Sequence, residues 1–295
     1  MTIATETGTG LESVIIPRLH DLGGFEVRRA LPSAERRMIG SFVFLDQMGP
    51  ARFPPGRGID VRPHPHIGLA TVTYLFAGEI FHRDTLGSAQ AIRAGEINWM
   101  TAGRGIAHSE RTDAPIRAAG GLVSGLQTWV GLPRTHEETE PSFAHHGTGS
   151  LPVVEGDRMT ARILIGSAFG AKSPVKTFSE MIYADMALKS GAQIQVPGDV
   201  EERGLYIVEG PIEIGGASYA PSQLLVLKPG AEIIVAAPGG ARVMLLGGEP
   251  LDGPRHLWWN FVSSSKERIE AAKRDWKEGR FGKVPGDDEF IPLPE

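Results

Sequence analysis

The sequence of 295 residues contains no cysteine. Disulfide bonds and thiolate zinc sites are therefore excluded, and any metal site must be built from histidine and carboxylate side chains. Positive charge is not in excess either, because 30 Lys and Arg residues stand against 35 Asp and Glu residues. A net charge of -5 gives no general attraction for nucleic acid or an anionic membrane. We expect this chain to bind neither directly.

Long apolar runs are also missing. No stretch approaches the roughly 20 apolar residues that a membrane-spanning helix needs. The first ten residues lack the basic segment followed by an apolar one that marks a secretory signal. These two absences predict a cytoplasmic protein.

Glycine and proline are abundant, with 38 and 22 residues, and they are set among short runs of Val, Ile, Leu and Phe. This pattern predicts many turns and short strands, as in Thr71–Phe76, Glu79–His82 and Glu96–Met100. An all-β sandwich or barrel follows. The length and an apolar content of 41% are sufficient for two domains, each with its own core.

Two segments each place metal-ligand side chains two residues apart: His64 with His66, and His108 with Glu110. In a strand, residues i and i+2 project from the same side, roughly 6.6 Å apart along the chain. Two such strands side by side can close three imidazoles and one carboxylate on a single ion. This donor set suits one divalent transition metal, with Fe first and Mn, Ni, Cu, Co or Zn as alternatives, better than Ca or Mg. Four protein ligands on a metal that accepts six leave two positions for water or substrate.

Five further residues have alternative roles beside this site. His82, followed by Asp84, could orient a ligand or the substrate, or form a plain surface turn. Trp99 and Met100 could line a pocket for an aromatic ligand, or belong to the core. Arg104 could pair with a buried carboxylate or attract an anionic substrate.

We divide the chain into four segments by composition. Residues 1–11, rich in Thr and Gly, are expected to be disordered, and residues 12–135 to form the first domain with the metal site. Residues 136–152 are polar, and we interpret them as a linker in which His136, His145 and His146 are solvated rather than ligands. Residues 153–295 are expected to form the second domain, including an amphipathic C-terminal helix at 265–279 that docks on its own protein.

The second half of the sequence resembles a worn copy of the first. Tyr206–Gly210 repeats the pattern of Tyr74–Gly78. Setting the two tyrosines in register places Val196 and Gly198 at the positions of His64 and His66. Aligning Gly95 with Ser222 places Val235 and Ala237 opposite His108 and Glu110. We therefore predict a duplicated architecture in which only the first copy keeps the metal ligands.

Three runs carry a family resemblance: His64–Tyr74, His82–Gly87 and Trp99–Glu110 closely resemble the pirin family of the cupin superfamily. The end of the chain, Gly247–Asp252 with Trp276–Gly282, resembles the C-terminal part of bacterial pirin-like proteins. The resemblance implies a bicupin of two tandem β-barrels, with one metal in the first barrel bound by His64, His66, His108 and Glu110.

Ala70 departs from the family pattern, because many pirins carry an acidic residue four positions after the second histidine. By alternation we expect Ala70 on the same face as His66. Its side chain would leave Glu110 as the only carboxylate positioned to bind.

Resemblance to bacterial pirins implies a quercetin 2,3-dioxygenase type of activity, in which O2 opens the central ring of a flavonol or a similar aromatic enol. The flavonol 3-hydroxyl and 4-carbonyl oxygens would chelate the metal, and Glu110 would act as general base for the hydroxyl. The alternative is a non-enzymatic metal-binding regulator, because eukaryotic pirins resemble redox-responsive transcriptional co-regulators. That role would require a protein partner, and turnover separates the two.

Overall fold

The computed structural model describes residues 10–21 and 25–295. Strands dominate the described residues, so the all-β prediction is confirmed. Residues 1–9 of the expected disordered segment lie outside the described residues, whereas β1 already begins at Leu11, which is buried. No helix in the described part of the chain is long and apolar enough to cross a membrane.

The first pair of sheets shares one apolar core. A seven-stranded antiparallel sheet has the order β1 (Leu11–Ile15), β22 (Leu224–Leu227), β19 (Glu202–Glu209), β24 (Ala241–Gly248), β17 (Met181–Leu188), β14 (Met159–Ile165) and β13 (Val153–Gly156). The accompanying four-stranded sheet has the order β18 (Ala192–Gln195), β23 (Ile234–Ala237), β20 (Ile212–Ile214) and β21 (Ala217–Tyr219). A short hairpin joins β15 (Ser167–Ala168) to β16 (Ala171–Lys172).

The second pair of sheets carries the histidines of the predicted metal site. Its four-stranded sheet has the order β5 (Asp60–His66), β10 (Ile106–Arg111), β7 (Glu79–Asp84) and β8 (Ala89–Arg93). Its seven-stranded sheet has the order β12 (Ser142–His146), β9 (Ile97–Thr101), β6 (Leu69–Ala77), β11 (Gly121–Gly131), β4 (Phe42–Phe53), β3 (Glu26–Leu31) and β2 (Arg18–Asp21). The remaining elements are the hairpin β25 (His256–Trp258) and β26 (Phe261–Ser263), the helices α1 (Ala114–Ala119) and α2 (Lys266–Lys277), and the 3-10 turn η1 (Arg134–His136).

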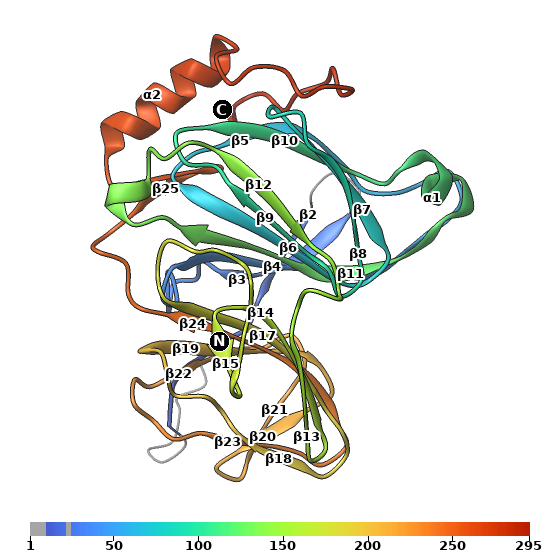
Figure 1. Cartoon of the computed structure of the whole chain (residues 1–295), viewed down its shortest axis with the longest axis vertical. Helices are drawn as coiled ribbons and strands as arrows, with labels where there is room; N and C mark the ends of the chain where they lie inside the picture. Colours follow the sequence, from blue (N-terminus) through green and yellow to red (C-terminus); the bar gives the residue numbers. More distant parts are fainter. Residues whose placement is uncertain (1–9, 22–24) are drawn as a thin grey trace. The chain divides into compact units, whose positions relative to one another are not determined.

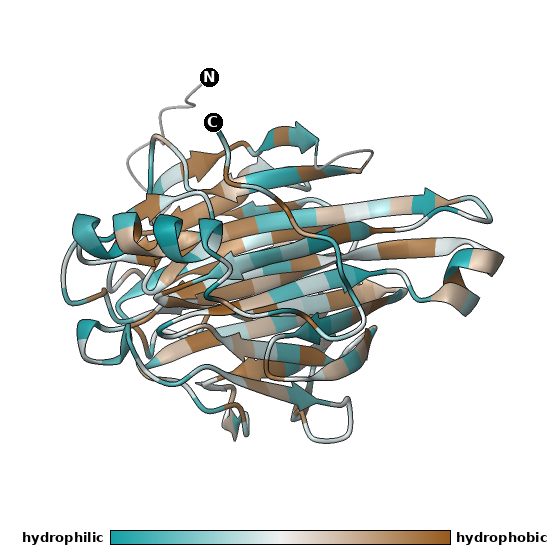
Figure 2. Cartoon of the chain, turned by 90° about the horizontal axis from the view of Figure 1, so that it is seen from above, coloured by the Kyte–Doolittle hydropathy of each residue, from teal (hydrophilic) through white to brown (hydrophobic). Residues whose placement is uncertain are grey.

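The described residues form two compact units (Figure 1). We call the first the apolar-core unit, made of the described residues within Met1–Leu19, Arg28–Leu45 and Thr148–Pro250. The second, the histidine unit, is made of the described residues within His20–Val27, Asp46–Gly147 and Leu251–Glu295. Within the strands, hydrophobic and hydrophilic residues are interleaved (Figure 2), as expected where one face of each strand is buried.

The apolar-core unit has the duplicated architecture without the ligands. Its strands β18 and β23 pair in antiparallel fashion, as β5 and β10 do in the histidine unit. Val196, Val235 and Ala237, which the sequence alignment placed at ligand positions, are all buried in its hydrophobic core. Burial of aliphatic side chains therefore stabilises this unit where the other unit carries imidazoles.

The C-terminal segment differs from its predicted place, since Leu251–Glu295 belongs to the histidine unit. Hydrogen bonding explains this, because Val262 N donates to the Ile67 carbonyl oxygen at the end of β5. Helix α2 begins after Ser265, whose hydroxyl accepts a hydrogen bond from Arg268 N and so caps the first turn. Its buried residue Ile269 packs with Phe261 and Ile67, so the helix docks on its own protein as predicted.

The expected linker, residues 136–152, is instead structured through His146. Strand β12 pairs with β9, with His145 opposite Asn98. The half-buried His145 also places its Nδ1 atom 2.8 Å from the Asn98 side-chain oxygen, so it is not a freely solvated residue. The polar composition of residues 136–152 did not indicate a solvated linker, because its polar groups bond to partners within the histidine unit.

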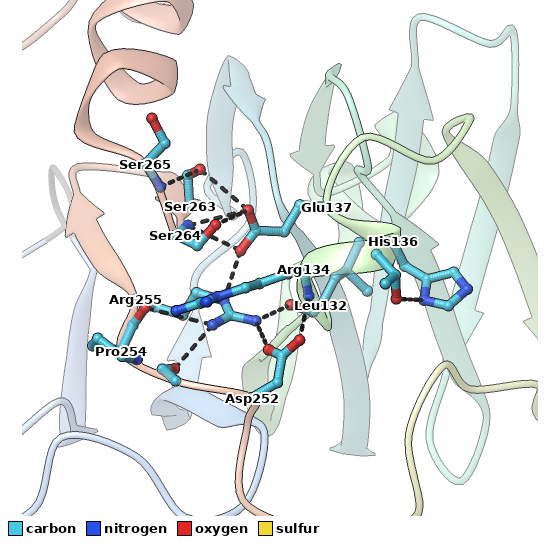
Figure 3. Close-up of polar contacts among 12 residues, drawn as sticks. Leu132, Arg134, His136, Glu137, Asp252, Pro254, Arg255, Ser263, Ser264 and Ser265 are labelled. Carbon is cyan, nitrogen blue, oxygen red and sulfur yellow. Dashed lines mark hydrogen bonds and ion pairs between the residues drawn. The ribbon is translucent and has the colours of Figure 1, made fainter.

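Glu137, which lies in the expected linker, forms a buried ion pair with Arg255 that fixes the hairpin β25–β26 (Figure 3). Arg255 Nε lies 2.7 Å from Glu137 Oε1, and the side chains are only 1% and 7% exposed. Glu137 also accepts hydrogen bonds from the backbone N–H and the hydroxyl of Ser264. Arg255 Nη2 donates to the Leu132 carbonyl oxygen at 2.8 Å. The start of the C-terminal segment is thereby held against the residues that follow β11.

Candidate metal centre

Three histidines meet at the centre of the histidine unit. His64 and His66 project from β5, and His108 lies opposite His64 in the antiparallel register of β10. All three side chains are buried, and one donor atom from each lies within 4.8 Å of the others. The two Nε2 atoms of His66 and His108 are 3.1 Å apart. The alternation of side chains along two paired strands therefore brings the three imidazoles together, as the sequence predicted.

The Nδ1 atoms of two of these rings point away from the shared space toward backbone acceptors. His64 Nδ1 lies 2.9 Å from the Arg62 carbonyl oxygen, and His66 Nδ1 lies 3.2 Å from the Asn260 carbonyl oxygen. A carbonyl oxygen only accepts, so Nδ1 carries the proton in both rings. Their Nε2 atoms are left as lone-pair donors.

Buried neutral imidazoles are what a metal requires. Burial lowers the pKa of His64 to about 4, although its hydrogen bond to Arg62 works in the opposite direction. Burial, and then the proximity of His64, lowers the pKa of His66 and of His108 well below the usual value. The three rings are therefore neutral at pH 7 and need lose no proton to bind a cation.

The geometry fits a transition-metal ion. Two nitrogen ligands at about 2.1 Å from one ion and at right angles to each other are about 3.0 Å apart. The observed Nε2 separation of 3.1 Å between His66 and His108 agrees with this value. Two unprotonated nitrogens that face each other at this distance repel unless a cation lies between them, so the donor set is suited to an ion.

Glu110 is near these rings but is not one of the converging group. Among the described residues, the donor atoms that lie within 4.8 Å of one another belong to the three histidines alone. The pairing of β10 with β5 shifts between His108 and Glu110, with the extra residue on β5, whereas the pairing of β10 with β7 is regular. Glu110 therefore stays on the His108 face of β10, opposite His82. The Thr73 hydroxyl donates to Glu110 Oε1 at 3.2 Å. Burial raises the pKa of the Glu110 carboxyl, which the hydrogen bond from Thr73 only partly offsets.

His82 and Asp84 lie inside the unit, so the surface-turn alternative is wrong. His82 is 4% exposed and Asp84 is 0% exposed. His82 Nε2 lies 3.0 Å from Asp84 Oδ2, and His82 Nδ1 lies 3.3 Å from His108 Nδ1. Burial alone would raise the pKa of Asp84, but hydrogen bonds from His82 and from Ser88 outweigh it and the pKa is lowered. Asp84 is thus a carboxylate that contacts the ligand group through His82.

Trp99 and Met100 lie on opposite faces of β9. Met100 is opposite Thr71 in the register of β6, two residues from Thr73 and therefore on the face that meets Glu110. Trp99 lies on the other face, and its Nε1–H donates to the Thr101 hydroxyl at 3.0 Å. Only Met100 is placed to line the site.

Sequence reasoning missed several residues around the site. The Trp129 ring meets the His66 ring edge-on at 5.2 Å, and the Phe143 ring stacks on His82 at 4.4 Å. Gln127 Oε1 lies 2.8 Å from the Thr73 hydroxyl and competes with Glu110 for its single proton. The alternation of Gln127 and Trp129 along one strand was a signal available in the sequence. No local pattern pointed to Phe143.

One of the two alternatives for Arg104, and the predicted face of Ala70, are wrong. Arg104 does not pair with a buried carboxylate, because its exposed guanidinium binds the exposed Glu140 at 2.7 Å. Ala70 does not share the site face, because its register partner is Thr101, on the face opposite Met100. The alternation expected from His66 is interrupted at Gly68, where the backbone has φ +67° and a Cβ would lie 2.0 Å from the Val262 carbonyl oxygen.

Comparison with protein families gives two matches. The model described as Pirin matches residues 24–130, and the model described as Pirin C-terminal cupin domain matches residues 183–282. The first match lies mostly in the histidine unit and the second mostly in the apolar-core unit. The bicupin architecture expected from the sequence is therefore confirmed.

Individual proteins are similar over nearly the whole chain. A "Pirin-like protein" of Caulobacter vibrioides is 51% identical over 97% of this chain and 100% of its own length. A Pseudomonas aeruginosa protein named "Putative quercetin 2,3-dioxygenase PA1205" is 42% identical over 89% of this chain and 82% of its own. A crystal structure of quercetin 2,3-dioxygenase from Acinetobacter baumannii is 35% identical, with a TM-score of 0.89 over 96% of this chain and 95% of that one.

Proposed function

The chain belongs to the pirin family, and from that premise we propose that it is a metal-dependent dioxygenase that opens the central ring of flavonols such as quercetin with O2. The observation that carries this proposal is the convergence of His64, His66 and His108, with the Nε2 atoms of His66 and His108 at 3.1 Å. Similarity at 42% identity to the protein named "Putative quercetin 2,3-dioxygenase PA1205" supports the choice of substrate class.

The metal would be held by the Nε2 atoms of the three histidines, with Glu110 as a fourth ligand after rotation of its side chain. The donor set suits a divalent transition metal, with Fe first and Mn, Ni, Cu, Co or Zn as alternatives. When bound, such an ion would polarise the 3-hydroxyl and 4-carbonyl oxygens of a flavonol and support electron transfer to O2. Asn260 and Arg62 hold two of the rings through their carbonyl oxygens.

Glu110 is suited to take the proton of the flavonol 3-hydroxyl. Its carboxyl has a pKa raised by burial, so the carboxylate is a stronger base than an exposed glutamate. Thr73 holds one of its oxygens by a hydrogen bond. A proton would pass from the substrate oxygen to a carboxylate oxygen of Glu110, leaving the substrate as the electron-rich enolate.

The apolar residues beside the histidines suit a flat aromatic substrate. Met100 and Trp129 share the face of Thr73, by their register opposite Thr71 in β6. Aromatic rings favour such surroundings, where stacking and edge contacts add to the burial of apolar area. Exclusion of water by these side chains would also protect the reactive enolate from side reactions.

The test is a turnover assay with defined metal content. Purified protein is stripped of metal, reloaded with each divalent transition metal in turn, and mixed with quercetin in air while the flavonol absorption band is followed. At least one metal is expected to give decay that a His66→Ala variant lacks. If no metal gives decay above that control, the dioxygenase proposal is wrong. Metal retained at stoichiometric level in such inactive protein would then favour the regulatory alternative.

A further inference from the structure

The hydrogen-bond partner of His108 differs in kind from the partners of the other two rings. His64 and His66 donate to carbonyl oxygens, which fix the proton on Nδ1. His108 Nδ1 instead faces a second imidazole, at 3.3 Å from His82 Nδ1. An imidazole nitrogen can donate or accept, so this contact alone does not decide which nitrogen of His108 carries its proton.

Asp84 decides it. Its carboxylate oxygen Oδ2 lies 3.0 Å from His82 Nε2, and a carboxylate only accepts. A neutral His82 ring therefore carries its proton on Nε2, and its Nδ1 is an acceptor. His108 then donates from Nδ1, which leaves its Nε2 lone pair directed at the space shared with His66, where the two Nε2 atoms are 3.1 Å apart.

Asp84 is itself fixed by the turn that follows β7. Its other oxygen, Oδ1, accepts hydrogen bonds from the backbone N–H groups of Leu86 and Ser88, at 2.9 Å and 3.0 Å. Both carboxylate oxygens thus have donors that do not depend on any metal. The side chain is fully buried, so water does not compete for these bonds.

His82 is also held by packing. Its ring stacks on Phe143 at 4.4 Å with an interplanar angle of 15°, which opposes rotation of the imidazole. Its Nδ1 points at the Nδ1 of His108, on the side of that ring away from His66. Among the described residues it is not part of the converging group of donors. His82 is therefore placed to position a ligand rather than to be one.

We infer that Asp84 and His82 form a relay that positions His108 for metal binding, by holding its proton on Nδ1 and its Nε2 lone pair toward the ion. The inference rests on the proposed metal centre and adds to it the residues that set the tautomer of one ligand. Partners of this kind typically change metal affinity by 10- to 100-fold. His64 and His66 need no such relay, because backbone carbonyl oxygens hold the proton on Nδ1 in these two rings.

Asp84→Asn is the informative substitution. The asparagine keeps the shape and one oxygen for the turn, but its NH₂ group donates toward His82 Nε2. His82 must then accept there and carry its proton on Nδ1, which makes His108 Nδ1 the acceptor. His108 is left with a proton on Nε2, the atom meant to bind the metal.

The first measurement requires no metal. Ring ¹⁵N chemical shifts of His108 in the metal-free protein are expected to show a protonated Nδ1 in the wild type and a protonated Nε2 in Asp84→Asn. Glu79→Gln is the matched control, because it makes the same carboxylate-to-amide change on the same strand at a surface ion pair with Arg93. It is expected to leave the His108 tautomer unchanged. An unchanged tautomer in Asp84→Asn overturns the inference whether or not the protein is a dioxygenase.

The second measurement is metal affinity, by competition with a chelator of known strength. Asp84→Asn is expected to bind Ni²⁺ or Fe²⁺ 10- to 100-fold more weakly than the wild type, and Glu79→Gln as tightly as the wild type. His82→Phe, which keeps a ring to stack on Phe143 but has no acceptor, is expected to lose affinity as well. Wild-type affinity in a folded His82→Phe protein contradicts the relay. Failure of quercetin turnover in the wild type leaves both measurements informative.

Discussion

The carboxyl of Glu110 receives a hydrogen bond from the Thr73 hydroxyl at 3.2 Å, and this contact sets where the proposed base stands. Thr73→Val removes the donor while keeping the branched shape of the side chain. Flavonol turnover is expected to fall by about tenfold or more, because a general base contributes about 10²- to 10⁴-fold only when it is held within reach of the proton. The measurement is kcat at fixed, saturating metal.

Thr71→Val is the matched control, since Thr71 lies two residues away on the same strand and the same face. It is expected to keep turnover within about twofold, and both variants are expected to keep the metal content of the wild type. Loss of metal in Thr73→Val, or equal losses of rate in the two variants, would contradict the role given to Thr73.

At this scale, sequence reasoning was reliable where strand alternation was unbroken. His64 and His66 share a face of β5, and His108 meets them across the ladder, as their spacing predicted. It was unreliable beyond a backbone irregularity. The turn at Gly68 put Ala70 on the face opposite to the one expected, and such a turn cannot be read from side-chain spacing alone. Glu110 does share the His108 face of β10, but it is not among the three donors that lie within 4.8 Å of one another.

At the scale of elements, the hairpin β25–β26 links the stability of the histidine unit to the metal site. The turn of this hairpin supplies the Asn260 carbonyl oxygen that holds His66 Nδ1, and the buried Arg255–Glu137 pair holds the hairpin. Loss of one partner from a buried pair leaves the other charge uncompensated, which costs about 3 to 5 kcal/mol. The position of His66 therefore depends on residues that never approach the site.

Glu137→Gln tests this dependence. The substitution is expected to lower the free energy of unfolding of the histidine unit by about 3 kcal/mol, because Arg255 keeps its charge but loses its buried carboxylate partner and is left with the exposed Asp252 alone. Metal affinity is expected to weaken too, because the Asn260 carbonyl oxygen is held less firmly. Chemical denaturation and chelator competition measure the two effects.

Glu138→Gln is the neighbouring control, since its ion pair with Arg268 is solvent-exposed and such pairs contribute about 0 to 1 kcal/mol. Equal destabilisation by the two substitutions would show that burial of the Arg255 pair has no special effect. The contrast also explains why the linker prediction failed. Glu137 and Glu138 look alike in the sequence, and the partner that distinguishes Glu137 lies 118 positions further along the chain.

At the scale of the whole molecule, the sequence predicted two β units and the loss of the ligands from one of them. It did not predict which ends of the chain belong to which unit. β1 pairs with β22, so the first described residues join the apolar-core unit, while Val262 bonds to Ile67 and Leu251–Glu295 joins the histidine unit. These pairings connect residues far apart in the sequence, and no local propensity specifies them.

The three histidines lie in one of the two units, so metal binding is expected to change the stability of that unit alone. All five tryptophans of the chain, Trp99, Trp129, Trp258, Trp259 and Trp276, lie in the histidine unit, so tryptophan fluorescence reports that unit alone. A metal that binds only the folded form stabilises it by about 2.7 kcal/mol when present at 100 times its Kd. Removal of the metal is therefore expected to lower the unfolding midpoint seen by fluorescence.

Hydrogen exchange supplies the comparison with the other unit. Strands β17 and β24 lie in the apolar-core unit, where aliphatic side chains fill the core. Their amide protection is expected to stay the same with and without metal, while that of β5 and β10 falls when metal is removed. His64→Ala is expected to abolish both metal-dependent changes, because it removes a ligand. A metal-dependent change of equal size in β17 and β5 would mean that the ion acts on the entire chain rather than at the three histidines.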